Sequence, residues 1–280
     1  MTLNDIYHAI DPVALSLGPL QIRWYGLAYV AGFICAFLVI AKLSQRWKIR
    51  IDDDAFFTVV FCVIFGVILG GRLGYVLVYG DGYYLQHPEK ILAFNEGGMS
   101  FHGGLVGVII GGVIAAKITK IPFLTLADMG VIGVPIGLFF GRCANFINGE
   151  LWGAPTDMPW GVVFGGAAGT MPRHPSQLYE ALLEGVVLFI ILFALSRKTP
   201  ARPRGTFFGT FLLLYGLFRF TIEFIRQPDA QIGYLLGTHW FTMGQALSIP
   251  LMVAGVVFLI YAWKTKKPQM GLPDSEISQS

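Results

Sequence analysis

The sequence VIGVPIGLFFGRCANFINGELWG, residues 131–153, joins an apolar run directly to a polar motif. The apolar part belongs to a window from Ile121 to Phe140, and about 20 residues are enough to cross about 30 Å of hydrocarbon. The polar part delivers four side chains to the end of that window: Arg142, Asn145, Asn148 and Glu150. Polar groups at this depth are costly unless they contact one another, water or a polar lipid moiety. The segment predicts a membrane helix that ends in a polar site at headgroup depth.

The composition extends this interpretation to the whole chain. Of 280 residues, 55% are hydrophobic and only 13% are charged, and the mean hydropathy is +0.63. These values exceed the usual balance of a soluble protein. We therefore expect an all-α polytopic integral membrane protein with about seven transmembrane helices. The windows are Ile22–Ala41, Ala55–Tyr79, Met99–Ala116, Ile121–Phe140, Leu178–Leu195, Thr206–Ile225 and Met243–Trp263.

The basic residues predict the orientation of these helices. Of the 20 Lys and Arg residues, 13 follow the first, third, fifth and seventh windows, and basic loops stay in the cytoplasm. The N-terminus is then outside and the C-terminus cytoplasmic. We expect one helical transmembrane domain over residues 1–267 with short periplasmic segments, and a disordered cytoplasmic tail over 268–280. The 13 residues are Lys42, Arg46, Lys48, Arg50, Lys117, Lys120, Arg197, Lys198, Arg202, Arg204, Lys264, Lys266 and Lys267.

The other seven basic residues fall on the outer side of this topology, and six of them are arginines. The planar guanidinium group matches a phosphate at two points, whereas lysine acts as a point charge. An arginine cluster inside an apolar bundle thus favours an anionic lipid headgroup as ligand. The alternative is that these side chains only reach the interface or form structural ion pairs. The seven are Arg23, Arg72, Lys90, Arg142, Arg173, Arg219 and Arg226.

The sixth window carries a polar stripe. Tyr215, Arg219 and Glu223 have helical i, i+4, i+8 spacing, and Arg226 follows seven residues after Arg219, so we expect all four on one helix face. Such a face must point into the bundle or a wet cavity. A salt bridge between Arg219 and Glu223 that only ties helices together is the alternative.

Three further windows carry glycine at every fourth position, which lets helix backbones approach closely in lipid. Beside the second of these rows lies His102, which can exchange a proton near neutral pH, although a single histidine is more often structural. Neither the other histidines nor the three cysteines have metal-ligand spacing. We expect no metal, no cofactor and no nucleic-acid partner. The rows are Gly66, Gly70, Gly74; Gly103, Gly107, Gly111; and Gly133, Gly137, Gly141.

Five motifs along most of the chain resemble the bacterial prolipoprotein diacylglyceryl transferases. They are IRWYGLAYVAGF, FHGGLVG, GRCANFINGELWG, RHPSQLYEALLEG and YGLFRFTIEFIRQPDAQIG, in that order. The resemblance implies a seven-helix enzyme of the bacterial cytoplasmic (inner) membrane with its active site toward the periplasm. Its substrates would be phosphatidylglycerol and the lipobox cysteine of a prolipoprotein signal peptide. The matching functional positions are Tyr25, His102, Arg142, Asn145, Glu150, Gly153, Tyr215, Arg219 and Glu223.

These residues suggest a mechanism for such a transfer. A peptide thiolate attacks the glycerol carbon that bears the phosphoester, a thioether forms, and glycerol phosphate leaves. Arg142 and Arg219 would stabilise the growing phosphate charge, and His102 is the candidate base, with Tyr25 as a further catalytic candidate. We expect Arg142, Asn145, Glu150, Gly153, Tyr215, Arg219 and Glu223 to bind phosphatidylglycerol, with Glu150 and Glu223 holding the arginines. The alternative function is a transporter or flippase of an anionic lipid or solute, which inverted repeats would favour.

Overall fold

The computed structural model describes residues 2–18, 20–80, 82–93, 97–228 and 233–272. Within these ranges the chain divides into two compact units, which are described separately here. Unit 1 comprises residues 1–43 and 128–268, and unit 2 comprises 44–127 and 269–280. The single domain expected over 1–267 stays a prediction, and residues 273–280 of the expected tail lie outside the described ranges.

Unit 2 is built around two long helices, α3 (Asp53–Tyr79) and α5 (Phe101–Thr119), joined through the short α4 (Tyr83–Gln86) and η1 (Pro88–Lys90). The first two glycine rows lie in the contact between α3 and α5. A side chain at Gly70 would collide with the backbone of Gly103 and Gly107. The prediction that these rows let two backbones approach closely is confirmed.

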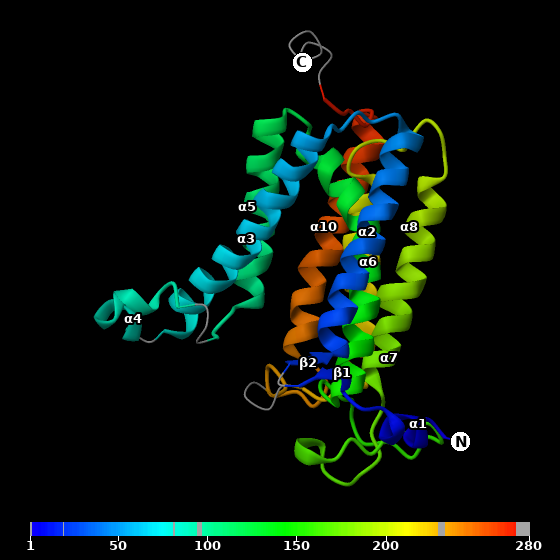
Figure 1. Ribbon diagram of the computed structural model, residues 1–280. Coiled ribbons are helices and arrows are strands. Elements are labelled where there is room, and N and C mark those ends of the chain that lie inside the picture. Colours follow the sequence, from blue (N-terminus) through cyan, green and yellow to red (C-terminus); the bar gives the residue numbers. More distant parts are fainter. Residues whose placement is uncertain (1, 19, 81, 94–96, 229–232, 273–280) are drawn as a thin grey trace. The chain divides into compact units, whose positions relative to one another are not determined.

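Unit 1 contains the other long helices (Figure 1). A short helix and a hairpin precede them: α1 (Leu3–Ala9), β1 (Val13–Leu17) and β2 (Leu20–Arg23), with the two strands antiparallel. Helix α2 (Trp24–Trp47) starts in this unit, and α6 (Phe123–Asn148) enters it at residue 128. The remaining elements are η3 (Gly166–Ala168), α7 (Ser176–Glu180), η4 (Ala181–Val187), α8 (Leu188–Ser196), α9 (Thr206–Ile222) and α10 (Met243–Thr265).

Close backbone contacts also hold unit 1 together. In the third glycine row, a Cβ added at Gly133 would lie 3.0 Å from the Cβ of Ala36 in α2, whereas one added at Gly137 or Gly141 would meet no atom within 4 Å. The close contact expected along this whole row is therefore found only at part of it. Helices α9 and α10 approach at Gly209, where an added Cβ would lie 2.9 Å from the carbonyl oxygen of Gly255. Asp128 of α6 holds the start of α9 in place. Its carboxylate accepts hydrogen bonds from the backbone amides of Gly205 and Phe208, both at 2.7 Å.

Six of the described helices are long and apolar enough to cross a membrane, when α7, η4 and α8 are taken as one continuous helix over Ser176–Ser196. Helix α9, with 17 residues, is a shorter apolar helix. This confirms a polytopic, mostly helical membrane protein, while the count of seven spans stays a prediction. Several expected bounds were wrong. The first span begins at Trp24 because residues 20–23 form β2, and α9 ends at Ile222 rather than Ile225. Helix α5 begins at Phe101 rather than Met99, and α6 at Phe123 rather than Ile121. Helix α6 continues through the polar motif to Asn148.

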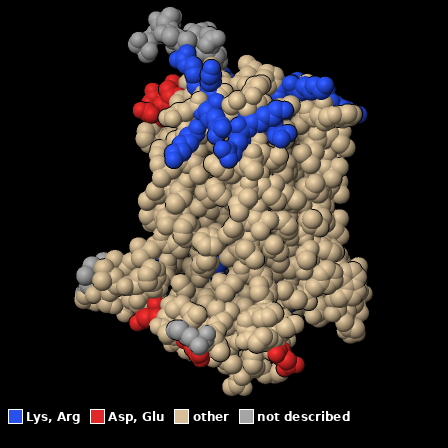
Figure 2. Space-filling view, turned by 90° about the vertical axis from the view of Figure 1, so that its right-hand side faces the viewer, with Lys and Arg blue, Asp and Glu red and all other residues tan. Residues whose placement is uncertain are grey.

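The basic residues that follow α8 and α10 lie at one end of unit 1. The two helices finish at the same end (Figure 1), and Figure 2 shows Lys and Arg side chains gathered there. The amide of Arg204 also donates to the carbonyl of Lys267 at 2.9 Å. One basic end is the arrangement that the positive-inside rule requires of these two helices.

We expect opposite locations for the two ends of the chain. Single cysteines placed at Thr2 and Ser280 in a background without native cysteines should differ in labelling by a membrane-impermeant thiol reagent in intact spheroplasts. Thr2 should react and Ser280 should react only after lysis, because an odd number of spans puts the termini on opposite sides. Equal labelling of both positions would show that the number of spans is even.

Candidate active site

Three arginines of unit 1 meet at one buried carboxylate, Glu180, the last residue of α7. The Nε of Arg142 lies 2.5 Å from its Oε2, and the Nη1 atoms of Arg219 and Arg226 lie 3.0 and 3.1 Å from its Oε1. The Glu180 side chain is 1% exposed, and the three arginine side chains are 10–18% exposed. A buried carboxylate of this kind is stable only when it is paired. Glu180 therefore fixes the position of three guanidinium groups.

The backbone explains why three separate segments reach this point. Helix α7 passes into the π-helix η4, and π-helical turns shift the register of a helix locally. Within η4, Gly185 lets α6 approach so closely that an added Cβ would lie 2.7 Å from the Cβ of Phe139. Arg142, one turn further along α6, is thereby brought to Glu180, and its Nη2 lies 3.6 Å from the Oε2 of Glu184.

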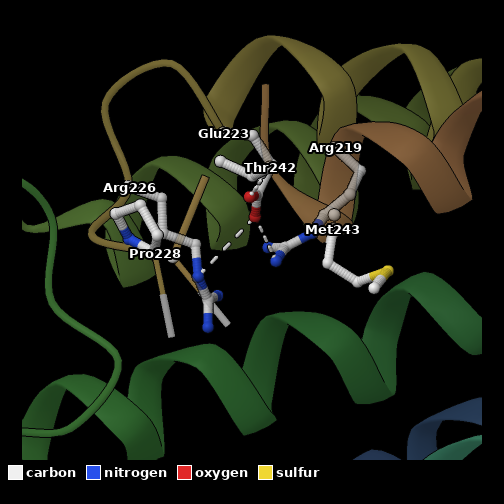
Figure 3. A pocket seen from close by; sticks show the side chains of 8 residues that line it. Arg219, Glu223, Arg226, Pro228, Thr242 and Met243 are labelled. Carbon is white, nitrogen blue, oxygen red and sulfur yellow. Dashed lines mark hydrogen bonds and ion pairs between the residues drawn. The ribbon is translucent and has the colours of Figure 1, made fainter. Parts of the chain in front are cut away.

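The carboxylate of Glu223 joins the cluster from the end of α9. It forms an ion pair with Arg219, lies 3.7 Å from the Nε of Arg226, and accepts a 2.5 Å hydrogen bond from the hydroxyl of Thr242. Figure 3 shows the carboxylate between the two guanidinium groups. These residues line a small pocket together with Pro228, Gly233, Met243 and Gly244.

Arg226 reaches the cluster by a different route from the one expected. Because α9 ends at Ile222, Arg226 does not share a helix face with Tyr215 and Arg219. It lies in an isolated bridge with Gly153. A Cβ at Gly153 would fall 2.6 Å from the carbonyl oxygen of Ile225 and 2.8 Å from that of His174. Gly153 thus places Arg226 through backbone contacts.

The end of α6 carries a second polar group. The amides of Asn145 and Asn148 donate to Oε1 of Glu150 at 2.9 and 3.3 Å, and the amide of Gln177 donates to the carbonyl of Glu150 at 2.6 Å. Glu150 therefore holds two asparagines, and the expectation that it holds the arginines was wrong. Gln177 lies three residues before Glu180, so this hydrogen bond connects the Gly141–Gly153 motif to the arginine cluster.

The segment between α6 and α7 forms a small structured region. Phe146, Val162, Phe164 and Ala168 form a buried apolar core with Tyr7 of α1 packed against it. Arg173 donates to the carbonyls of Ala168 and Gly153 and lies 5.9 Å from the ring centre of Trp152. These contacts are structural, but they join Arg173 to backbone carbonyls and an aromatic ring rather than to the ion-pair partner that the structural alternative named. Burial lowers the pKa of the nearby His174, which favours its neutral form.

The remaining predicted residues lie on several elements. Tyr215 lies one helical turn before Arg219 on α9, where it stacks on Phe211 and interacts electrostatically with Arg219, Glu184 and Arg142 of the cluster. Tyr25 is a 37% exposed residue in the first turn of α2. His102 is an exposed residue in the first turn of α5, in unit 2. Its relation to the arginine cluster remains a prediction. Arg72, also in unit 2, is 1% exposed and donates to the backbone carbonyls of Lys90, Ile91, Gly97 and Gly98.

Glu180 and Glu184 were not predicted as site residues. A signal for them was present, because both carboxylates lie in a predicted span at i, i+4 spacing, and acidic residues within a span face the bundle interior. Arg226 was identified from the sequence, but its contact with Glu180 was not. Among the described residues, no group of three or more His, Cys, Asp and Glu side chains could hold a metal ion.

Chemically, the cluster has the features of an anion site in an apolar bundle. Three guanidinium groups with fixed positions offer several N–H donors, and in a site of low dielectric these interact strongly with an anion. The carboxylates of Glu180 and Glu223 pair with these guanidinium groups, and Glu184 lies 3.6 Å from the Nη2 of Arg142. This arrangement suits a phosphate group that enters, gains negative charge and leaves.

Comparison with known proteins gives one consistent result. The family model described as prolipoprotein diacylglyceryl transferase matches residues 12–261. A phosphatidylglycerol–prolipoprotein diacylglyceryl transferase of Geobacter sulfurreducens is 52% identical over 257 residues, 92% of this chain and 97% of the relative. Proteins of the same description from Nitratidesulfovibrio vulgaris and Cupriavidus metallidurans are 50% and 49% identical, covering 89% and 92% of this chain and 94% and 96% of those relatives.

Proposed function

Because the chain belongs to the prolipoprotein diacylglyceryl transferase family, we propose that it transfers the diacylglyceryl group of phosphatidylglycerol to the lipobox cysteine of a prolipoprotein. The product is a thioether, and glycerol phosphate is released. The observation that carries the proposal is the convergence of Arg142, Arg219 and Arg226 on Glu180 inside an apolar bundle. This arrangement suits a substrate whose phosphate lies at headgroup depth.

The arginines act on the leaving group. As the bond between the glycerol carbon and the phosphate oxygen breaks, the phosphodiester with one negative charge becomes a phosphomonoester with up to two. Guanidinium groups aimed at that phosphate interact more strongly with the transition state than with the ground state. Glu180 holds Arg142 and Arg219 in place before the substrate arrives, so little reorganisation is needed when the charge develops.

The remaining residues orient the substrate. Asn145 and Tyr215 contact the headgroup, Glu150 fixes the amide of Asn145, and Gly153 places Arg226. His102 takes the proton of the incoming thiol, and Tyr25 is the next candidate for that role. The enzyme lies in the bacterial inner membrane with its active site toward the periplasm, because the 13 basic residues that set the topology lie at the opposite ends of the spans.

A transporter or flippase is not favoured. The relatives of about 50% identity are transferases by name over most of their length. An inverted repeat with broken helices, the usual mark of a transporter, is not apparent in the sequence.

The direct test of the function is a transfer assay. Purified protein in detergent should convert a lipobox peptide, in the presence of phosphatidylglycerol, to a product heavier by the diacylglyceryl group. Mass spectrometry should place the added mass on the cysteine sulfur, and glycerol phosphate should appear in equal amount. A peptide with serine in place of the cysteine should give no product. Failure of the cysteine peptide under conditions in which the protein is folded would contradict the proposal.

His102→Gln should slow transfer and leave phosphatidylglycerol binding nearly unchanged, because glutamine keeps the size and hydrogen bonding of histidine but cannot take the thiol proton. Part of the lost rate should return at alkaline pH, since a free cysteine thiol, with a pKa of about 8.5, then ionises unaided. Transfer rates measured from pH 6 to 9 test this. Wild-type rates for the variant over that whole range would mean that another group is the base.

A further inference from the structure

The pocket at the end of α9 is lined by groups that would suit a phosphate, yet a side chain of the protein itself lies among them. Arg219 and Arg226 supply guanidinium groups, Thr242 supplies a hydroxyl, and α10 begins at Met243. Helix N-termini and paired guanidinium groups are recurrent phosphate ligands. The anion that these groups surround is the carboxylate of Glu223.

The first turn of α10 is shaped around that carboxylate. A Cβ at Gly244 would lie 2.6 and 2.7 Å from the two carboxylate oxygens of Glu223, so only glycine leaves room for them. Thr242 is the N-cap of α10: its hydroxyl accepts from the amide of Gln245 and donates to Glu223. The carboxylate of Glu223 therefore lies beside the positive end of a 23-residue helix.

Glu223 already occupies the donors that a phosphate would use in this pocket. Its carboxylate pairs with Arg219, lies 3.7 Å from the Nε of Arg226 and accepts from the hydroxyl of Thr242. A phosphodiester can take these three donors only if the carboxylate of Glu223 moves away. Arg219 and Arg226 would keep a counter-charge during this exchange, because both also contact Glu180.

We propose that Glu223 is an internal stand-in for the substrate phosphate, which occupies the phosphate position in the empty enzyme and is displaced when the headgroup binds. The proposal rests on the transferase function proposed above and adds a role in product release. When glycerol phosphate has formed, the carboxylate of Glu223 competes with it for the same two guanidinium groups. An internal competitor lowers the apparent affinity of the enzyme for every anion that binds in place of the Glu223 carboxylate. Glycerol phosphate is then released more easily, which limits product inhibition.

Glu223→Gln tests this directly. Glutamine keeps the size of the side chain and an oxygen for the hydroxyl of Thr242, but it loses the negative charge that competes with phosphate. Glycerol phosphate should bind the purified variant at least tenfold more tightly than it binds the wild type, as measured by calorimetry. Phosphatidylglycerol in nanodiscs should also bind the variant more tightly than the wild type if the phosphate of the intact headgroup occupies the position of the Glu223 carboxylate. Tightening for glycerol phosphate alone would overturn displacement by the intact headgroup and keep only the competition with the released product.

Asp157→Asn is the matched control, because it removes an exposed carboxylate of the same unit outside the cluster. Its anion affinity should equal that of the wild type. Equal or weaker binding by Glu223→Gln would overturn the proposal, and so would equal tightening in Asp157→Asn, which would show a general effect of net charge. Because the readout is binding, it is independent of transfer: absence of transfer in all variants would contradict the function, not the stand-in role.

A second variant covers the case in which Glu223→Gln does not fold. Glu223→Ala can be purified in acetate, a free carboxylate able to occupy the position left by the side chain, and then exchanged into glycerol phosphate. Glycerol phosphate should raise the thermal midpoint of this variant more than that of the wild type, since ligand binding stabilises the folded state. No difference between the two shifts would overturn the proposal.

Discussion

Glu180→Gln is expected to lower the free energy of unfolding by about 3 to 5 kcal/mol and to reduce transfer by about 100-fold or more. Three largely buried guanidinium groups share this carboxylate as a counter-ion. Glutamine keeps the shape of the side chain but has one acceptor oxygen and no charge. The guanidinium groups would then keep only Glu184 and Glu223 as counter-ions, and an uncompensated buried charge is costly.

The loss of stability can be measured as the thermal midpoint of the protein in detergent, followed by size-exclusion chromatography after heating. The loss of activity can be measured as the rate of peptide transfer. Glu89→Gln serves as the matched control. Glu89 has a 64% exposed side chain and pairs with His87, and exposed pairs of this kind contribute little. A Glu180→Gln protein with the thermal midpoint of the wild type would show that Glu180 does not organise the arginines.

Arg142→Lys and Arg219→Lys are each expected to lower turnover by about 2 to 4 kcal/mol of transition-state stabilisation, which corresponds to roughly 30- to 1,000-fold. Lysine keeps the positive charge but loses the two-point geometry of guanidinium. Arg219 also contacts Glu180 and Glu223 at the same time, which a single ammonium group cannot reproduce while it contacts phosphate. The amount of folded protein in the membrane should fall much less than turnover.

Arg197→Lys is the control for these two variants, because Arg197 is an exposed residue directly after α8. Its turnover should be that of the wild type. Measurement of kcat and KM separates the two possible roles: a fall in kcat indicates loss of an interaction made in the transition state, whereas a rise in KM alone indicates loss of ground-state binding. Full activity of Arg142→Lys or Arg219→Lys would remove the phosphate role from that residue.

The membrane class, most helix positions and the family follow from the sequence. Apolar windows of about 20 residues have few alternatives to a membrane helix, because the backbone must satisfy its own hydrogen bonds in hydrocarbon. The glycine rows of α3 and α5 predicted a close contact, since small residues at helical spacing have one common use in membranes. The motif from Gly141 to Gly153 likewise indicated a polar site, because its residues are local in sequence.

The partners within that site did not follow from the sequence. Glu180 is 39 residues from Arg219 and 46 from Arg226, and helical periodicity gives the face of a helix but not the helix that it meets. Periodicity was also wrong for Arg226, because α9 ends at Ile222 and a bridge to Gly153 then sets the position of Arg226. Glu150 was expected to bind arginine on charge alone, yet the fold places the amides of Asn145 and Asn148 beside it. Charge and spacing define which residues need a partner, whereas contacts between distant segments determine which partner each one has.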